Sequence, residues 1–120
     1  MHEMSIAQGI LDIVYQHVAP ADRARVGDVI VRVGRLSGVI PESLEFCFGA
    51  LVAETDVGRA RLAIERVPTV CHCPDCDRRF DAEALIFLCP ACGSGRARLV
   101  SGADLQVVSI ELDDEHEAHP

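Results

Sequence analysis

The sequence predicts an α+β fold: a small domain of two helices on a three-stranded sheet, with an inserted zinc-ribbon-like module. Helical and alternating patterns of apolar residues succeed one another along residues 4–67, which predicts both kinds of element. Four closely spaced cysteines then interrupt the pattern before one further alternating segment. The chain has 120 residues, about half of them apolar, which suits one domain or a small domain that carries a smaller one.

Two helices are predicted from apolar spacing and from their boundary residues. Residues 4–18 form the first helix, whose apolar face comprises Ala7, Ile10, Leu11, Val14 and Val18. Pro20 ends it. Residues 41–54 form the second helix, because Pro41 suits the first helical position and Glu42 suits the positive end of the helix dipole. The apolar face of this second helix comprises Leu44, Cys47, Phe48, Leu51 and Val52.

Three strands are predicted from alternating segments. Residues 25–36 contain Gly27 and Gly34, which indicate a bulge in the first strand. Residues 61–67 form the second strand and are followed by Pro68, and residues 105–112 form the last strand. We therefore divide the chain into an α+β domain of residues 1–69 and 99–112, an inserted zinc-binding module of residues 70–98, and a disordered acidic tail of residues 113–120.

The four cysteines form two C-x-x-C pairs separated by twelve residues, and they are Cys73, Cys76, Cys89 and Cys92. Two such pairs at this distance predict a four-thiolate zinc site, because each short loop places both sulfurs on one side of a turn. Pro74 and Pro90 favour these turns, and Gly93 can adopt the positive φ of a turn exit. We expect a small apolar cluster over the metal, formed by Phe80, Ile86, Phe87 and Leu88. A closed site of this kind holds a fold together and leaves no position for chemistry.

Other cysteines and histidines have plainer interpretations. Cys71 is a spare thiol near the site, a rival zinc ligand or a redox group, and His72 is a surface residue or a conditional ligand. Cys47 belongs to the core, and His17 suits the negative end of the first helix. Two histidines of the acidic tail are solvated or bind metal weakly, and they are His116 and His119.

Composition restricts the class of function. The formal net charge is −8, whereas nucleic-acid binders normally carry the opposite sign. Four arginines flank the cysteine pairs, where they could offset thiolate charge or lie in solvent: Arg78, Arg79, Arg96 and Arg98. No apolar run predicts a membrane span, and no basic segment at the N-terminus predicts a secretory signal, so we expect a cytoplasmic, reducing location. No phosphate-binding glycine loop and no Ser-His-Asp pattern is present, so we expect no enzyme activity.

The start of the chain is the remaining candidate for function. His2 follows the amine of Met1, so the amine nitrogen, the His2 amide nitrogen and the ring Nδ1 can share one plane. Ni²⁺ and Cu²⁺ accept such tetragonal nitrogen ligation, whereas zinc does not favour it. Binding must displace protons from an amine that titrates near about pH 8 and an imidazole near about 6.5, so affinity should weaken as pH falls. The plainer interpretation makes His2 a surface residue and Glu3 an acid of the first helical turn.

Together the Met1-His2-Glu3 start, the α+β pattern and the C-x2-C-x12-C-x2-C module resemble the HypA family. These are nickel metallochaperones for [NiFe]-hydrogenase maturation, some of which also serve urease, and the resemblance spans nearly the whole chain except the tail. It implies that His2 is the essential nickel ligand, with the Met1 amine and Glu3 nearby, and that the four cysteines hold structural zinc. It implies as partners the nickel-handling GTPase of the same pathway and the hydrogenase large subunit. We expect no nucleic-acid or membrane partner, and either a monomer or a homodimer.

Two other classes of protein remain open at this point. A zinc-ribbon interaction or adaptor protein without nickel is supported by the four arginines near the cysteines and opposed by the overall acidity. An iron–sulfur electron-transfer protein would use the same cysteines and would be coloured.

Overall fold

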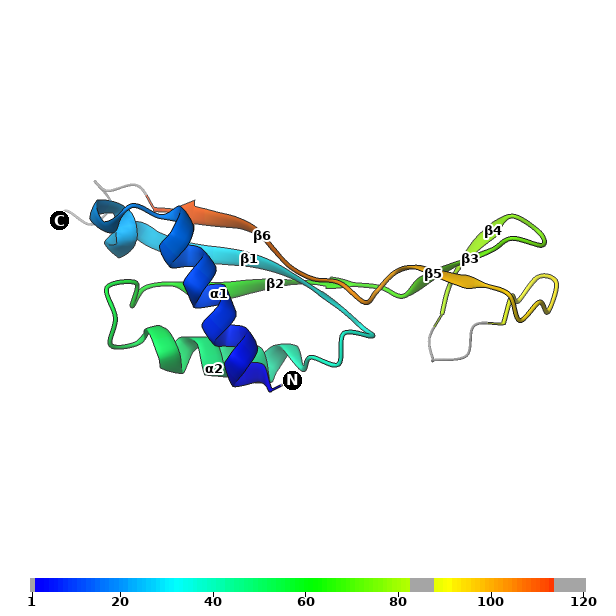
Figure 1. The fold of residues 1–120 in the computed structure, drawn as a ribbon, viewed down its shortest axis with the longest axis horizontal. Coiled ribbons are helices and arrows are strands. Elements are labelled where there is room, and N and C mark those ends of the chain that lie inside the picture. The colour runs from blue at the N-terminus through cyan, green and yellow to red at the C-terminus, as the bar shows by residue number, and fades with distance from the viewer. Residues whose placement is uncertain (1, 83–87, 114–120) are drawn as a thin grey trace.

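The computed structural model describes residues 2–82 and 88–113, which form an elongated molecule of 61 × 27 × 23 Å (Figure 1). The elements follow in the order α1 Glu3–His17, η1 Pro20–Arg25, β1 Val26–Gly34, α2 Pro41–Val52, β2 Arg61–Val67, β3 Val70–Cys73, β4 Arg78–Asp81, β5 Arg98–Ser101 and β6 Leu105–Leu112. Within these residues the strands form two three-stranded sheets, in the orders β2-β1-β6 and β4-β3-β5. Figure 1 shows the two sheets toward opposite ends of the long axis. The predicted α+β fold with an inserted module is confirmed.

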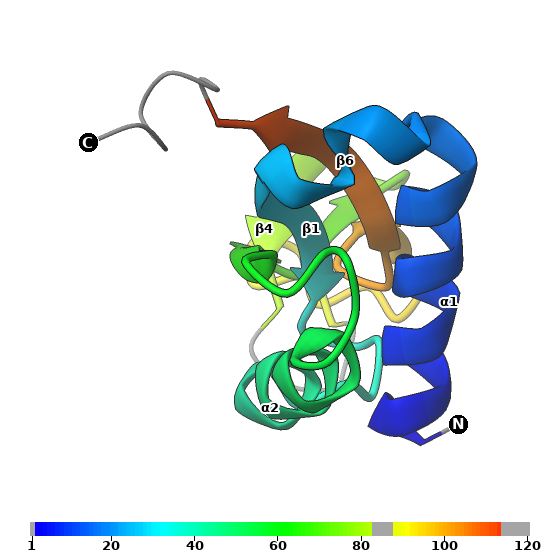
Figure 2. The same cartoon turned by 90° about the vertical axis from the view of Figure 1, so that its left-hand side faces the viewer.

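One face of the first sheet and the two helices enclose the core. α1 contributes Ile6, Ala7, Ile10, Leu11 and Val14, and α2 contributes Leu44, Phe48 and Val52. β1 turns alternate side chains inward, so Val29, Val31 and Val33 are buried while Arg32 is exposed. Figure 2 looks along the long axis and shows both helices on the same side of the sheet. Each fully buried aliphatic side chain of this core contributes about 1.5–3 kcal/mol relative to exposure.

The order of strands differs from the order in the sequence. β1 pairs parallel with β2, with α2 as the crossover, and β6 returns from the second sheet to pair antiparallel with β1. The pairing of β1 with β6 shifts register twice, first beside Gly27 in β1 and then at Val108 in β6. The shift beside Gly27 confirms the bulge predicted from the glycines of β1. On the solvent face, Asp28 pairs with Arg61 at 2.6 Å across β1 and β2.

The helix boundaries differ slightly from those predicted. α2 ends at Val52 rather than Glu54, because the Thr55 hydroxyl donates a hydrogen bond to the Val52 carbonyl at 2.8 Å and turns the chain. Pro20 begins a short 3₁₀ helix, η1, that the pattern of apolar residues does not predict. His17 lies in the last turn of α1, as predicted, and its Nδ1 donates to the Ile13 carbonyl at 2.9 Å.

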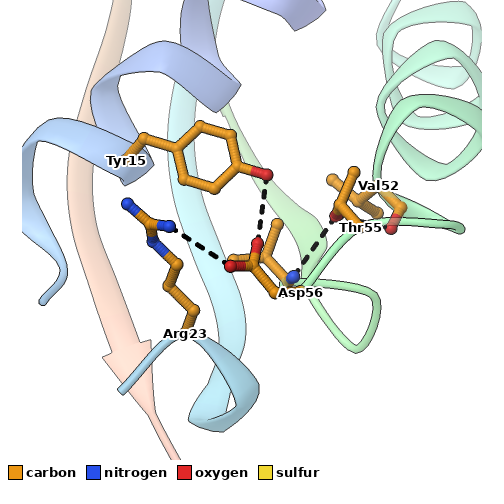
Figure 3. Close-up of polar contacts among 6 residues, drawn as sticks. Tyr15, Arg23, Val52, Thr55 and Asp56 are labelled. Carbon is orange, nitrogen blue, oxygen red and sulfur yellow. Dashed lines mark hydrogen bonds and ion pairs between the residues drawn. The ribbon is translucent and has the colours of Figure 1, made fainter. Parts of the chain in front are cut away.

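A polar clip joins α1, η1 and the loop after α2 (Figure 3). The hydroxyl of Tyr15 donates to one oxygen of Asp56 at 3.2 Å, and Arg23 pairs with the other oxygen at 3.2 Å. The Arg23 guanidinium lies 4.6 Å from the centroid of the Tyr15 ring, a cation–π arrangement. The clip therefore fixes the end of α1 against the loop that leads into β2.

The connection between the two sheets is tightly packed around glycines. A Cβ atom at Gly34 would lie 2.1 Å from the carbonyl oxygen of Gly102, and Gly102 itself has φ +113°. The Leu36 amide donates to the Gly102 carbonyl at 2.7 Å, so the loop after β1 crosses the strand that returns from the second sheet. The two sheets are thus joined by several hydrogen-bonded segments that cross one another.

Replacing Gly102 with alanine should lower the free energy of unfolding by about 1–3 kcal/mol or more, because an L side chain is strained at this φ. The added Cβ would also lie 2.7 Å from the Cα of Thr69, which is backbone and cannot rotate away. Urea unfolding followed by circular dichroism measures the effect. Gly49→Ala is the control, because a Cβ at Gly49 meets nothing within 4 Å. Equal unfolding midpoints for Gly102→Ala and the unmodified chain would contradict the tight crossing.

Candidate metal sites

The structure brings the four predicted cysteines together. The Sγ atoms of Cys73, Cys76, Cys89 and Cys92 all lie within 4.8 Å of one another. Cys73 and Cys92 are 3.6 Å apart, and Cys76 and Cys89 are 3.5 Å apart. A tetrahedral zinc ion about 2.3 Å from each sulfur places the sulfurs about 3.8 Å apart. The donor set and its spacing therefore fit one closed tetrahedral site.

The two C-x-x-C loops have the same local geometry. The Asp77 amide donates to the Cys73 carbonyl at 2.8 Å, and the Gly93 amide donates to the Cys89 carbonyl at 2.8 Å. Asp77 and Gly93 each directly follow the second cysteine of a pair, and they have φ +58° and +75°. The positive φ predicted for Gly93 is confirmed. At Asp77 a short polar side chain tolerates the same left-handed conformation.

Hydrogen bonds and desolvation separate the pKa values of the thiols. The backbone N–H groups of Cys92 and Ala91 lower the pKa of the Cys89 thiol to about 6. Desolvation and hydrogen bonds with neighbouring sulfurs raise the pKa of the Cys76 thiol to about 12. Near neutral pH Cys89 is therefore ready to bind a cation as thiolate, whereas Cys76 must first lose a proton. Cation binding at the cluster should release protons and weaken as the pH falls.

The surroundings of the thiols only partly match the predictions. Arg96 pairs with Asp75 at 3.2 Å, so its charge is directed to a carboxylate. Arg78, Arg79 and Arg98 are exposed. Leu88 is 56 % exposed, so it does not contribute to a buried cluster over the metal as we expected. Phe80 is half-buried, while Ile86 and Phe87 lie outside the described residues.

Neither Cys71 nor His72 joins the thiol cluster. Cys71 is fully buried in β3 opposite Phe80 and Leu99, and burial raises the pKa of its thiol. His72 Nε2 lies 2.8 Å from the carboxylate of Asp77. This geometry favours the plainer interpretation of both residues. Cys47 packs against the core, as predicted.

The second candidate site is the start of α1. His2 is exposed and extended, with φ −88° and ψ +147°, and its side chain makes no capping hydrogen bond. Its carbonyl accepts hydrogen bonds from the amides of Ser5 at 3.0 Å and Ile6 at 3.2 Å. The His2 amide precedes the first helical turn, so the helix does not use it. Glu3 begins the helix and is half-buried, and Met1 lies outside the described residues.

The two candidate sites occupy different places in the molecule. Figure 1 shows the start of α1 beside α2, and the loops that carry the four cysteines at the far end of the long axis. From the sequence we expected the closed zinc site to hold the module beside the nickel terminus, and that expectation is wrong.

The fold and the thiol cluster define a small α+β protein with a zinc-ribbon-like module. Residues 1–112 match the family described as "Hydrogenase/urease nickel incorporation, metallochaperone, hypA", and the chain belongs to this family. The resemblance inferred from the sequence is thereby confirmed. The family is one of metallochaperones and not of enzymes.

Named relatives and solved structures agree with this assignment. The chain is 42% identical over 113 residues to the hydrogenase maturation factor HypA of Geotalea uraniireducens, which covers 94% of this chain and 100% of the relative. It is 41% identical over 116 residues to the HypA of Streptomyces avermitilis, covering 95% of this chain and 88% of the relative. The solution structure of the Ni metallochaperone HypA from Helicobacter pylori superposes with a TM-score of 0.63 at 24% identity, covering 96% of this chain and 100% of that chain. A second HypA solution structure gives 0.68 at 23% identity, covering 93% and 96%, and both show the shared fold.

The described helices have no membrane-spanning character. None of them is both long enough and apolar enough to cross a bilayer.

Proposed function

We propose that the chain binds Ni²⁺ at its N-terminus and delivers it for [NiFe]-hydrogenase maturation, while the four cysteines hold structural zinc. Membership of the nickel-incorporation family carries the general role. The Met1 amine, the His2 amide and the His2 imidazole are the proposed nickel ligands, with Glu3 nearby.

The geometry at the start of α1 supports nickel ligation. The His2 side chain is exposed and makes no capping hydrogen bond, so its ring is available to an ion. The His2 amide lies ahead of the helical hydrogen bonds, so its deprotonation and ligation would break none of them. Planar nitrogen donors of this kind suit nickel rather than zinc. The helix can therefore stay intact whether or not the cargo is bound.

A site at a chain terminus also suits release. The His2 side chain lies at the surface, so a partner can replace it as a ligand without opening the core. We propose the nickel-handling GTPase of the pathway and the hydrogenase large subunit as these partners. A cytoplasmic location, the state of monomer or homodimer, and the division into residues 1–69 with 99–112, 70–98 and 113–120 stay predictions from the sequence.

The cysteine cluster supports a structural role for zinc. The four sulfurs surround a single position, and Cys73 and Cys89 are buried. Four protein ligands complete a tetrahedral ion and leave no place for substrate. The ion would join the loop after β3 to the loop that precedes β5.

The untagged chain is expected to bind nickel and zinc at separate sites, with one ion of each per chain. Equilibrium dialysis against nickel, followed by elemental analysis, measures both. The nickel should leave as the pH falls, because protons compete with the metal for its nitrogen ligands. The absorbance spectrum of the purified protein provides a second check, since thiolate-bound zinc is colourless and an iron–sulfur cluster is not. A chain that holds zinc but no nickel would be an adaptor protein instead.

A further inference from the structure

A continuous apolar groove runs between α1 and β6. Two adjoining cavities of about 280 and 530 Å³ form it, and Ile13 and Val107 line both. One end lies beside Ser5 and Ile6, and the other lies beside His17 and Asp22. Figure 2 shows β6 at the edge of the sheet next to α1. The groove therefore follows most of the length of both elements.

The groove exists because the helix layer does not fully cover β6. The inward side chains of β1 are buried, whereas Leu105 and Leu112 of β6 are 38% and 40% exposed. β6 also lies at the end of the strand order, and within the described residues it pairs only with β1. One backbone edge of β6 is thus left without a partner strand beside an apolar floor.

A strand edge next to an apolar groove suits one kind of occupant. The free N–H and C=O groups of an edge can pair with an extended chain, and alternate side chains of that chain then point into the groove. A helix could fill the groove but would leave the edge groups of β6 unpaired. The geometry therefore favours an extended segment.

The charge of the groove elements indicates what that segment carries. The groove is lined by one acid, Asp22, whose carboxylate pairs with Arg25 at 3.1 Å, and by no lysine or arginine. Glu3, Asp12 and Glu111 lie on α1 and β6 outside the lining, and neither element contains lysine or arginine. Two copies of this chain paired through β6 would bring like charges together. A segment from another protein that alternates apolar with basic residues would be attracted instead.

We propose that this groove binds an extended, apolar and basic segment of a partner protein, which adds a fourth strand to the sheet along β6. The end of the groove at Ser5 lies three residues from His2, so a bound segment would extend toward the start of α1. That link to nickel transfer rests on the proposed function, whereas binding in the groove does not.

A synthetic peptide of alternating valine and lysine tests the proposal, with eight residues to match β6. Fluorescence anisotropy measures its affinity for the full chain, and ¹⁵N-labelled protein shows which amides it shifts. We expect the largest shifts in β6 and α1. A valine–glutamate peptide of the same length should bind at least about tenfold more weakly, because its charges are reversed.

A matched pair of glycine variants locates the binding. Gly9 lines the groove, and a Cβ placed there meets nothing within 4 Å, so Gly9→Leu should add a side chain to the groove. We expect it to weaken binding of the peptide by about tenfold or more. Gly49→Leu makes the same change in open space on α2 and should leave the affinity unchanged.

The possible outcomes distinguish an extended segment of a partner protein from a helix or a second copy of this chain in the groove. Absence of binding at about 100 µM peptide, equal affinity for a helical basic peptide, or an unchanged affinity in Gly9→Leu would each overturn the proposal. A dimer that Gly9→Leu dissociates would make a second copy the occupant and would also overturn it. Nickel content measured in the same variants tests the metal site separately, because Gly9 is not among its proposed ligands.

Discussion

Replacing His2 with alanine is expected to abolish stoichiometric nickel binding while the zinc content of the chain stays at one ion. The substitution removes the imidazole, which is the one exposed side-chain nitrogen at the proposed site. The amine and amide that remain cannot complete a planar chelate of useful affinity. Because His2 makes no side-chain capping hydrogen bond, the helix should form as before, and circular dichroism should be unchanged. Elemental analysis after dialysis gives both metal contents.

A second variant tests the same site through the amine. Residues added before Met1 convert the amine into an amide and should abolish nickel binding in the same way. His17→Ala is the control, since His17 lies at the opposite end of α1 and bonds to the Ile13 carbonyl. An extended chain that still binds one nickel ion would remove the terminal chelate as the mechanism.

Replacing Cys73 with serine is expected to eliminate zinc and to unfold the second sheet. Structural zinc sites in small modules contribute about 10–16 kcal/mol of apparent binding energy, which in such modules is folding energy. Without zinc the second sheet has little buried surface to stabilise it, because β4 and β5 have mostly exposed side chains. Amide NMR spectra should lose the dispersed signals of β3, β4 and β5 and should keep those of β1 and β2.

Cys71→Ala is the matched control for the zinc site. Cys71 lies two residues from Cys73 on the same strand and is fully buried, yet it is not part of the thiol cluster. This variant should keep one zinc ion, although its stability should fall as a buried sulfur is lost. Loss of zinc in Cys71→Ala, or an intact second sheet in Cys73→Ser without zinc, would contradict the assignment.

Local patterns in the sequence predicted most of the elements. The spacing of Ile10, Leu11 and Val14 predicted α1 because a helix buries one face, and that face is indeed buried. The paired cysteines predicted the thiol cluster because each short loop fixes its own geometry. In both cases the pattern that determines the structure lies within a few neighbouring residues, so contacts with distant parts of the chain did not change the predicted element.

The remaining features depend on contacts between distant residues. The clip joins Tyr15 and Arg23 to Asp56, which lies 41 and 33 residues further along the chain. The position of β6 at the edge of the sheet, beside the groove, follows from its pairing with β1, and no local pattern in the sequence indicates that pairing. η1 and the short strands of the second sheet carry too few residues to show a period. The separation of the two candidate sites likewise follows from the path of the whole chain.

β6 follows the second sheet in the sequence, and this order affects how the molecule folds. Residues 68–104, which contain the second sheet, form a loop between β2 and β6 that must close before β6 can pair with β1. Zinc would draw the middle of this loop together and reduce the entropy lost on closure. A chain starved of zinc should therefore complete its first sheet less readily. The supply of zinc would then determine how much folded protein is available to bind nickel.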